Sequence, residues 1–251
     1  SWNVNSVGAR KDRLIAWLGK HAPDVICLQE LKGVDDAFPR AEVEALGYHV
    51  ETFGQRTYNG VAILSKSPMT DVRRNFGDGD EDVEARMISA RIEGLTVMSC
   101  YIPNGKELSS DKFAYKMRWL TRLKAYLNAH HTPSDPLCVC GDYNIAPEDR
   151  DVHYPVLWAG QIHCTPEERG ALRDRCGLGL VDAFRLFEQP EKQYSWWDYR
   201  QMAFRRNRGL RIDHILLSQA LAKRCEACVI DRDSRKWEQP SDHTPVIATI
   251  A

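Results

Sequence analysis

Strand-like and helical segments alternate along the whole 251-residue chain, and this alternation limits the folds that are open to it. Short apolar runs rich in Val, Ile and Cys predict buried strands, as at 24–29 and 137–140. Apolar residues at helical spacing predict helices at 10–20 and 111–130. No Gly/Ser/Pro-rich linker divides the sequence. We therefore expect one domain, residues 1–251, of class α/β, with β-sheets packed face to face and helices outside.

Other segments complete the expected order of elements. Further strands are predicted at 49–53, 61–65, 87–92, 95–102, 194–199, 211–217, 225–230 and 246–250, with a tight hairpin at Glu93-Gly94. Further helices are predicted at 41–46 and 166–175, and Ser109 or Ser110 is the expected N-cap of the helix at 111–130.

Polar side chains gather where four short apolar runs end. The segments concerned are Trp2-Asn3-Val4-Asn5, Leu28-Gln29-Glu30, Gly141-Asp142-Tyr143-Asn144 and Ser241-Asp242-His243-Thr244-Pro245. Asp, Glu and Asn supply the oxygen ligands that a hard divalent cation such as Mg²⁺ prefers. Such a cation can neutralise a phosphodiester and stabilise its leaving oxygen. The pattern therefore predicts a metal site on a rim of strand ends, and with it metal-dependent cleavage of phosphoesters.

Three residues are candidates for binding that cation or for catalysis beside it: Glu30, Asp142 and Asn144. Glu30 follows a buried strand and is predicted to anchor the metal, although alone it would be read as a surface glutamate. Asp142 and Asn144 have strand-type spacing, which would place both side chains on one face. Asp142 can bind metal or accept a proton from water, and the Asn144 amide can steady developing charge. An ordinary Asx-turn beside Gly141 is the alternative.

Asp213, His243 and Tyr101 are the other catalytic candidates. A carboxylate such as Asp213 raises the pKa of a neighbouring histidine, and the resulting imidazolium of His243 can bind a phosphate oxygen. Tyr101 ends a strand, and its phenol can donate to phosphate. Asp242 could face the metal. Singly, His243 would be a loop residue and Tyr101 a packing residue, so the hypothesis depends on the joint pattern.

Composition excludes some classes of protein. A net charge of −1 and a pI near 6.7 argue against a protein that coats nucleic acid by bulk charge. Arginines cluster locally between Tyr199 and Arg211, where they could hold phosphates or form a solvated loop. No run approaches the roughly 18 consecutive apolar residues of a membrane span, so no membrane association is expected.

Eight cysteines in a chain of this length do not suggest a disulfide framework. Cys27, Cys138 and Cys140 stand in apolar runs, where they are expected to be buried thiols. The segment 225–228 has zinc-knuckle spacing but lacks a partner pair, which favours two thiols on one strand. A cytoplasmic location is expected. Because the chain begins at Ser1 without Met, we also expect the front of the first strand to be missing.

Several longer motifs occur in order along nearly the whole chain. They are Trp-Asn-Val-Asn at 2–5, Pro-Asp-Val-Ile-Cys-Leu-Gln-Glu at 23–30, Tyr-Asn-Gly-Val-Ala-Ile-Leu-Ser-Lys at 58–66, Tyr-Ile-Pro-Asn-Gly at 101–105, Gly-Asp-Tyr-Asn-Ile-Ala-Pro at 141–147, Trp-Trp-Asp-Tyr-Arg at 196–200, Arg-Gly-Leu-Arg-Ile-Asp-His-Ile-Leu at 208–216 and Pro-Ser-Asp-His-Thr-Pro-Val at 240–246. Together they resemble the exonuclease III and apurinic/apyrimidinic endonuclease family, within the endonuclease/exonuclease/phosphatase superfamily. The segment 157–182 resembles the bacterial exonuclease III branch.

The resemblance implies a fold, an activity and a cofactor. The fold would be a four-layer α/β sandwich with two mixed β-sheets packed face to face. The activity would be hydrolysis of duplex DNA in repair, either on the 5′ side of abasic sites or as 3′–5′ trimming of 3′ ends. The cofactor would be Mg²⁺, for which Mn²⁺ can substitute. The protein would act on DNA with abasic sites or 3′ ends, as a monomer.

The resemblance also assigns residues, matched to the motifs given above. The metal ligands fall on Asn3 or Asn5, Glu30 and Asp242, with Asp142 and Asn144 close by; the catalytic tyrosine falls on Tyr101 and the Asp–His pair on Asp213 and His243. Whether Asp142 or His243 is the base stays open, as does the number of metals. A pocket for a flipped-out, baseless sugar maps to Trp196, Leu210 and Ile212, and phosphate contacts map to Asn104 and Lys106. Ile212 could equally be a core residue.

His163 departs from the family pattern, in a region that lines the DNA in relatives. A bulky side chain there could narrow the groove and favour 3′ ends over abasic sites, whereas a surface histidine is the simpler interpretation. The sequence leaves two rival functions open. One is a phosphatase for small or lipid phosphoesters, which the aromatic and Arg-rich stretch 196–211 disfavours. The other is a catalytically inactive nucleic-acid-binding regulator, which should have lost ligand positions that are all filled here.

Overall fold

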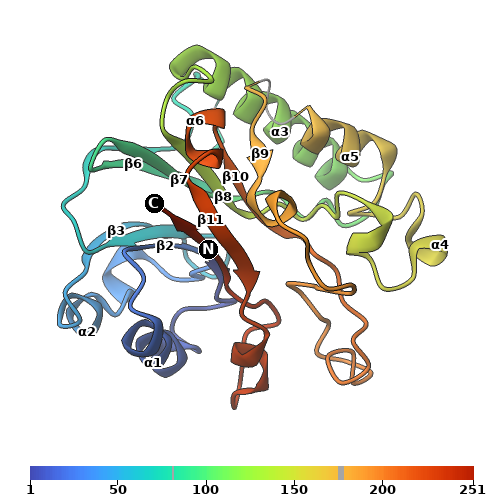
Figure 1. Ribbon diagram of the computed structural model, residues 1–251, viewed down its shortest axis with the longest axis horizontal. Coiled ribbons are helices and arrows are strands. Elements are labelled where there is room, and N and C mark those ends of the chain that lie inside the picture. Colours follow the sequence, from blue (N-terminus) through green and yellow to red (C-terminus); the bar gives the residue numbers. More distant parts are fainter. Residues whose placement is uncertain (81, 175–177) are drawn as a thin grey trace.

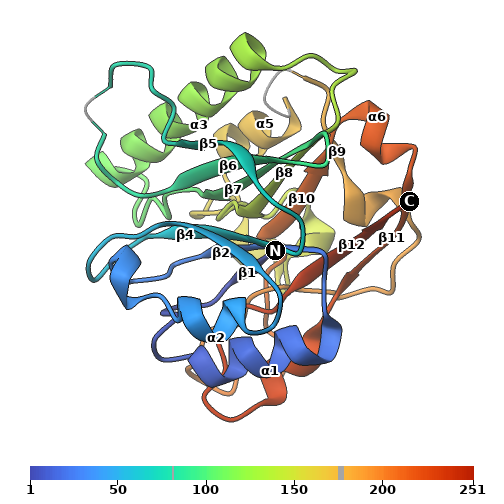
Figure 2. The same ribbon diagram turned by 90° about the vertical axis from the view of Figure 1, so that its left-hand side faces the viewer.

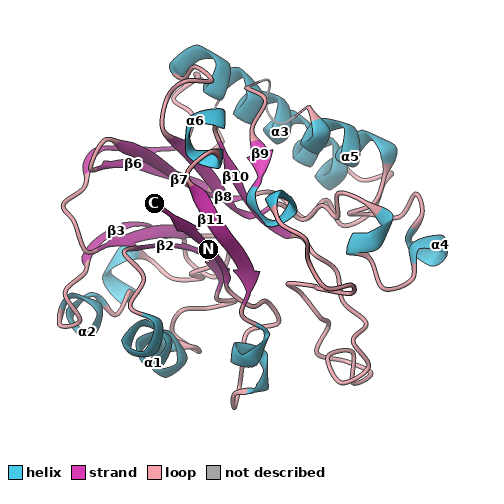
Figure 3. Ribbon diagram, viewed as in Figure 1, coloured by secondary structure: helices cyan, strands magenta, loops and turns pink. Residues whose placement is uncertain are grey.

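The computed structural model describes residues 1–80, 82–174 and 178–251, and its helices cover the outer faces of two β-sheets (Figure 1). In the view turned by 90°, helix, sheet, sheet and helix follow one another from top to bottom (Figure 2). Colouring by secondary structure shows the strands gathered in the centre and the long loops at one side (Figure 3). The four-layer α/β sandwich expected from the sequence is confirmed.

The first sheet is built from the N-terminal quarter of the chain. Its strands, in the order β1-β2-β4-β3, are β1 (Trp2–Asn3), β2 (Val25–Gln29), β3 (His49–Phe53) and β4 (Val61–Ser65). The pair β1–β2 is parallel and the other pairs are antiparallel, so the sheet is mixed.

The second sheet is larger and also mixed. Its strands, in the order β5-β6-β7-β8-β10-β9, are β5 (Thr70–Arg74), β6 (Met87–Ile92), β7 (Leu95–Tyr101), β8 (Leu137–Asp142), β9 (Val181–Asp182) and β10 (Asp213–Leu217). The pair β7–β8 is parallel, because the long helix that joins these two strands returns the chain to the same edge.

The C-terminal strands form a separate two-stranded sheet beside the first sheet. β11 (Cys225–Ile230) and β12 (Val246–Ile250) pair antiparallel with each other. Ser1 and Val246 exchange two backbone hydrogen bonds of 2.8 and 2.9 Å, which join β12 to the chain just before β1. The N-terminus therefore lies beside the beginning of β12.

The helices are α1 (Lys11–His21), α2 (Arg40–Glu44), α3 (Asp111–His130), α4 (Pro155–Trp158), α5 (Pro166–Arg173) and α6 (Gln219–Ala222). Short 3₁₀ turns lie at Asp35–Ala37, Asp149–Asp151, Ala183–Leu186 and Arg232–Lys236. Ser110 caps α3, its hydroxyl accepting from the backbone N–H of Phe113 at 3.3 Å. Among the described residues, no helix combines the length and apolar character needed to cross a membrane.

Three apolar clusters fill the three interfaces between the four layers. Cys27 and Ile63 of the first sheet meet Ile88 and Cys140 of the second in the central cluster. A second cluster packs α3 onto the second sheet, and a third packs α1 and α2 onto the first sheet. Central strands such as β4 and β8 are covered on both faces, so they read as nearly continuous apolar runs, and the polar groups of the site stand at their ends.

The structure differs from the sequence expectations at several elements. The segment 194–199 is not a strand, since only Trp196 forms isolated bridges, to Leu210 and His243. β5 was not predicted, because four of its five residues are exposed and it shows no apolar alternation. The helix expected to reach residue 175 ends at Arg173 as described, and residues 175–177 lie outside the described residues.

Candidate active site

Three candidate residues lie in one row across the second sheet. The parallel register of β7 and β8 pairs Tyr101 with Asp142, and the antiparallel register of β8 and β10 pairs Asp142 with Asp213. On the facing sheet, Asn3 ends β1 and Glu30 directly follows β2. Each residue stands where a buried strand reaches the rim, so the fold brings together side chains that are far apart in sequence.

Asn3 joins the two sheets at this rim. Its Nδ2 donates to Oε1 of Glu30 and to Oδ2 of Asp142, both at 2.9 Å, and Asn3 itself is completely buried. One ligand atom from each of Glu30, Asp142 and His243 lies within 4.8 Å of the others, a spacing suited to one metal ion. Among the described residues, this is the one such group of His, Cys, Asp and Glu side chains.

Asp213 holds the imidazole of His243. Nδ1 of His243 donates to Oδ2 of Asp213 at 2.9 Å, and its Nε2 lies 3.7 Å from Oδ2 of Asp142. Burial alone would lower the pKa of His243, but the carboxylates of Asp213 and Asp142 outweigh burial and raise it to about 10. The buried hydroxyl of Ser195 donates to Asp213 at 2.6 Å and fixes that carboxylate in turn.

Carboxylates crowd the centre of the site. Burial, with the nearby charges of Asp213 and Glu30, raises the pKa of Asp142 to about 7, although His243 opposes the shift. A divalent cation between Glu30 and Asp142 would offset this repulsion, and their oxygens are the ligands that Mg²⁺ prefers. The donor set therefore fits a hard cation. Lys32, whose Nζ lies 3.0 Å from Oε2 of Glu30, supplies positive charge on the other side of that carboxylate.

Tyr101 presents a protonated phenol to the same group. Burial, together with the charges of Glu30 and Asp142, raises its pKa well above the ordinary value for tyrosine. The guanidinium of Arg86 lies over the ring, 4.9 Å from its centroid, and donates to the carbonyl oxygen of Tyr101 at 3.2 Å. A phenol held in this way can donate to a phosphate oxygen.

Asn144 does not lie on a strand beside Asp142, as its spacing had suggested. β8 ends at Asp142, and Asn144 follows in a left-handed conformation with φ 51°. Its backbone N–H donates to Oδ1 of Asp142 at 2.9 Å, which is the Asx-turn alternative. Its Nδ2 donates to the carbonyl of Ile102 at 3.0 Å, and its Oδ1 accepts from Asn104 at 3.1 Å. The turn thus places the amide near the site by a different route.

A buried ion pair supports the Asn144 turn. Lys116 and Glu168 both have completely buried side chains and contact each other directly. Nζ of Lys116 also donates to the carbonyls of Asn144, at 2.7 Å, and Asn104, at 3.2 Å. Glu168 accepts from the backbone N–H of His163 at 3.1 Å. Three loops that reach the site are therefore tied together beneath it.

Asn5 and Asp242 lie beside this group and are bonded to each other. Nδ2 of Asn5 donates to Oδ1 of Asp242 at 2.9 Å, and Nε1 of Trp196 donates to Oδ2 of Asp242 at 3.0 Å. Both carboxylate oxygens of Asp242 therefore have protein partners, and Asp242 does not join Glu30, Asp142 and His243 in the group described above. A metal-binding role for Asn5 and Asp242 stays a prediction.

The three residues assigned to a sugar pocket are in contact but differ in exposure. Leu210 and Ile212 are 0% and 2% exposed and belong to one apolar cluster, against which Trp196 and Trp158 pack. Trp196 and Trp158 are each partly exposed. The two indoles therefore offer the accessible apolar surface here, and the part played by Leu210 and Ile212 stays a prediction.

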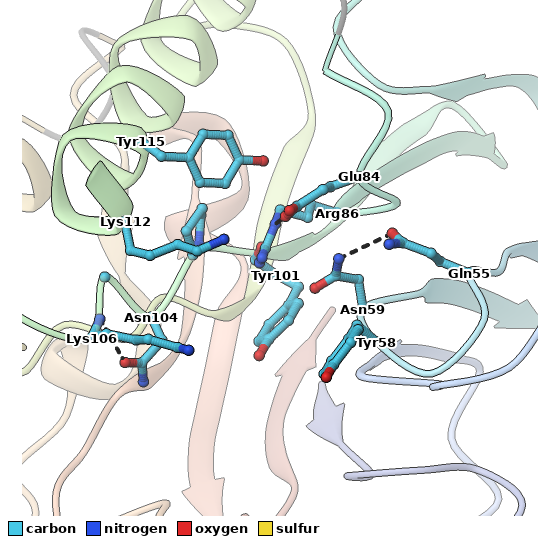
Figure 4. A pocket seen from close by; sticks show the side chains of 12 residues that line it. Gln55, Tyr58, Asn59, Glu84, Arg86, Tyr101, Asn104, Lys106, Lys112 and Tyr115 are labelled. Atoms are coloured by element: carbon cyan, nitrogen blue, oxygen red, sulfur yellow. Dashed lines mark hydrogen bonds and ion pairs between the residues drawn. The ribbon is translucent and has the colours of Figure 1, made fainter. Parts of the chain in front are cut away.

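A cavity of about 400 Å³ adjoins the group on the side of Tyr101. Asn104, Lys106 and Lys112 line it on one side, and Arg86, paired with Glu84 at 2.5 Å, lines it on the other (Figure 4). The two lysines give this space positive charge. Such a cavity can receive an anionic group. The placement of Asn104 and Lys106 next to Tyr101 is compatible with the phosphate contacts that were predicted for them.

The Arg-rich segment does not act as a single exposed patch. Arg211 is 1% exposed and forms ion pairs with Asp151 and Asp182 at 2.7 and 2.8 Å. Arg200 pairs with Asp198 at 2.8 Å, whereas Arg205 and Arg206 are exposed. The expectation of a patch that includes Arg211 was therefore wrong, because two buried carboxylates draw that side chain into the interior.

Sequence reasoning missed several residues that build the site. Ser195, Lys32, Lys116 and Glu168 stand in segments that read as ordinary loop or helix surface, and their partners come from distant parts of the chain. Lys116 carried one usable signal, since its position on α3 falls among the apolar residues of the buried face. The other three carried none.

Comparisons with known proteins agree with this geometry. Residues 1–243 match the Endonuclease/Exonuclease/phosphatase family. The chain is 42% identical to exodeoxyribonuclease III of Haemophilus influenzae over 260 residues, covering 99% of this chain and 97% of the relative. The fold is similar to that of the 3′ phosphatase NExo from Neisseria, solved with a product DNA hairpin, with a TM-score of 0.95, 39% identity and coverage of 100% and 97% of the two chains. It is also similar to an AP endonuclease from Archaeoglobus fulgidus, with a TM-score of 0.94, 38% identity and coverage of 99% and 96%.

Proposed function

The chain belongs to the endonuclease/exonuclease/phosphatase family, and from that membership we infer that it is a DNA repair nuclease that hydrolyses phosphodiesters. The relatives are named as an exodeoxyribonuclease III, a 3′ phosphatase and an AP endonuclease. All of these names describe hydrolysis of phosphate esters in DNA. The enzyme is therefore a metal-dependent hydrolase.

One observation carries this conclusion. Ligand atoms of Glu30, Asp142 and His243 lie within 4.8 Å of one another, and Asp213 holds the histidine from behind. Residues that converge from four strand ends in this way match the requirements of phosphodiester hydrolysis, in which negative charge must be neutralised and a water molecule must lose a proton. A divalent cation bound by Glu30 and Asp142 would supply charge neutralisation and stabilise the leaving oxygen.

The protein's own side chains supply the remaining chemistry. Asp142 can accept the proton that water loses when its oxygen adds to phosphorus, whereas His243 could accept it only in its neutral form. The imidazolium of His243 and the phenol of Tyr101 can each donate a hydrogen bond to a phosphate oxygen. The turn at Asn144 leaves one N–H of its amide available for the same purpose. Asp213 does not touch the substrate but fixes the orientation of His243.

We propose Mg²⁺ as the cation, with Mn²⁺ as a substitute, because the group is dominated by carboxylate oxygens. The test combines the purified protein with Mg²⁺, Mn²⁺, Zn²⁺ or EDTA and a labelled duplex. Cleavage with Mg²⁺ and Mn²⁺ but not with EDTA would support the proposal. Activity that is highest with Zn²⁺ would contradict it.

Labelled duplexes then separate the activities. One duplex carries an internal abasic site, one a recessed 3′ end and one a 3′-phosphate. We propose that the enzyme acts on all three, since the relatives' names include each of these reactions. Asp213→Asn serves as the control for contaminating nucleases, because it should fold yet cleave slowly. Release of phosphate only from small or lipid phosphoesters would favour the rival function.

We further propose that 3′-end trimming exceeds abasic-site cleavage. His163 is 8% exposed rather than a surface residue, and its Nδ1 donates to the carbonyl of Asn144 at 2.6 Å. Its ring therefore occupies space directly beside the Asn144 turn. Because His163 has a φ of 72°, His163→Gly relieves an unfavourable backbone conformation and should fold. The variant should cleave abasic sites relatively faster, and an unchanged ratio of the two activities would refute the idea.

Oligomeric state and location are proposed in the same way. We propose a monomer, to be checked by sedimentation at several protein concentrations. A cytoplasmic location is supported by the buried free thiols of Cys27, Cys138 and Cys140. A fluorescent fusion imaged in cells would decide it.

A further inference from the structure

A short helical turn next to the site exposes two adjacent apolar side chains. In α4, Val156 is 90% exposed and Leu157 is 72% exposed, and Tyr154 just before the helix is 50% exposed. α4 projects from the rim of the molecule, away from the four layers (Figure 1). Among the described residues, Val156 is the most exposed of the large apolar side chains. Such exposure costs free energy in water unless the side chains serve a contact.

Backbone hydrogen bonds and side-chain packing fix the position of α4. Pro155 begins the helix, and the N–H groups of Leu157 and Trp158 both donate to the carbonyl of Tyr154, at 3.0 and 3.1 Å. Trp158, the last residue of α4, packs against the apolar cluster that contains Leu210. This contact attaches α4 to the body of the protein beside the active site. Val156 and Leu157 are therefore presented at a fixed position.

The route from this turn to the catalytic group is short. The ring of Trp158 lies 6.3 Å from the ring of His163, centroid to centroid, and His163 donates to the carbonyl of Asn144. The guanidinium of Arg208 lies 5.9 Å from the ring centroid of Tyr154. Arg205 and Arg206, both exposed, precede Arg208 in the same loop. The apolar tip thus lies beside positive charge and close to the place of cleavage.

These features suit DNA better than a protein partner. A stable protein interface buries on the order of 1,600 Å², far more than two or three side chains can supply. A small apolar tip flanked by arginines matches the side chains that DNA-binding proteins insert between base pairs, where the tip unstacks bases and the arginines hold phosphates. The occupant to which the geometry points is a base-pair step of the substrate duplex.

We propose that Val156 and Leu157 form a wedge that opens the terminal base pair of a DNA duplex next to the cleavage site. The proposal rests on the function proposed above. An enzyme that removes nucleotides from a paired 3′ end must separate each terminal nucleotide from its partner before the phosphodiester can enter the site. The wedge would stabilise that separated state, and so it would matter only where the end is paired.

The test uses the full-length double variant Val156→Ser/Leu157→Ser, with Val229→Ser as the matched control. Val229 is 50% exposed on β11, away from α4. Each protein is given Mg²⁺ and two duplexes that differ only in the 3′-terminal nucleotide, which is paired in one and mismatched in the other. The double variant should trim the paired end about tenfold more slowly, and the mismatched end within about twofold of the wild-type rate.

A second measurement follows the opening itself. A duplex with 2-aminopurine at the 3′ terminus and a phosphorothioate linkage before it is titrated with each protein in EDTA. Fluorescence should rise when the wild type or Val229→Ser binds, because the probe unstacks, and it should rise much less with the double variant.

The outcomes separate this inference from the function on which it rests. A wild-type protein that degrades no DNA would overturn the proposed function and the wedge together. A wild-type protein that degrades DNA while the double variant slows equally on both duplexes, or on neither, would overturn the wedge alone. The same holds if the double variant gives the full fluorescence rise. A monomeric double variant alongside a dimeric wild type would show that the tip binds a second copy instead.

Discussion

Nδ1 of His243 lies 2.9 Å from Oδ2 of Asp213, and both residues are at least 95% buried. This contact joins β10 of the second sheet to the loop before β12, so it closes the site across the two layers. It also fixes the direction of the imidazole, whose other nitrogen faces Asp142. Catalysis should therefore depend on Asp213 even though this carboxylate lies behind the histidine.

Asp213→Asn should reduce kcat by about a hundredfold or more, with little change in KM, since the substrate does not contact Asp213. Steady-state kinetics on the recessed 3′ end would measure this. Ser195→Ala should cost far less, about tenfold, because Asp213 keeps its contact with His243 when the hydroxyl of Ser195 is removed. Equal losses in the two variants would show that Asp213 acts mainly through the fold.

Glu30→Gln should weaken metal binding rather than the fold. The substitution keeps the shape of the side chain and can still accept from Asn3, but it removes the negative charge that attracts a divalent cation. The Mg²⁺ concentration for half-maximal activity should rise about tenfold or more. Isothermal titration with Mg²⁺ alone gives a readout independent of activity. Glu42→Gln, on the exposed face of α2, is the control and should bind Mg²⁺ like the wild type.

Lys116→Met should destabilise the protein by about 3–5 kcal/mol, since it leaves Glu168 charged and unpaired in the interior. Adding Glu168→Gln should recover part of that loss, because the buried charge is then gone. Urea denaturation of the two single variants and the double variant gives the coupling free energy. If the free energies of unfolding simply add, the pair does not contribute as a unit.

Much of the fold could be predicted from the sequence because its strands are covered on both sides. Runs such as Val61–Ser65 are wholly buried, and all their residues but Ser65 are apolar, so they can be recognised as strands from the sequence alone. The prediction missed β5 for the opposite reason. An edge strand such as Thr70–Arg74 needs no apolar face, so its sequence shows no apolar pattern. The prediction of a strand at 194–199 was wrong because these residues pack from a loop. Tyr194 packs with Trp197, which is fully buried, and Trp196 packs against the cluster that contains Leu210.

The site could be predicted only in part from the sequence. The physical reason differs from one residue of the site to the next. Glu30 and Asp142 stand at the ends of predicted strands, so strand prediction also places them on one rim. Asp213 lay inside the predicted strand 211–217, and only the structure shows that the strand begins at this residue. Ser195 was not predictable, because its role comes from a hydrogen bond to Asp213, which only the folded chain brings near. Asn144 shows an intermediate case: its proximity was anticipated, but an Asx-turn rather than strand alternation produces it.

The buried network around Arg211 should make stability depend on pH. Burial would raise the pKa of Asp151 and of Asp182, but the guanidinium of Arg211 outweighs burial and lowers both below their ordinary values. Carboxyl groups with a depressed pKa in the folded state stabilise it at pH values above about 4, the pKa of the unfolded chain. That stabilisation is lost as the pH falls through the lower, folded-state values.

Arg211→Leu removes the guanidinium that the two carboxylates share. Asp151 still pairs with Arg185, but Asp182 loses its ion-pair partner, so burial raises the folded-state pKa of Asp182 instead. The variant should be less stable than the wild type by about 3–5 kcal/mol near pH 7, where it buries unpaired charge. The difference should shrink toward pH 4, because protonated carboxyls need no cation. Chemical denaturation at intervals between pH 4 and 7 measures this. Lys236→Ala, which breaks an exposed pair with Asp233, should show little change at any pH. A difference for Arg211→Leu that is constant across this range would mean that lost packing, not charge, accounts for its effect.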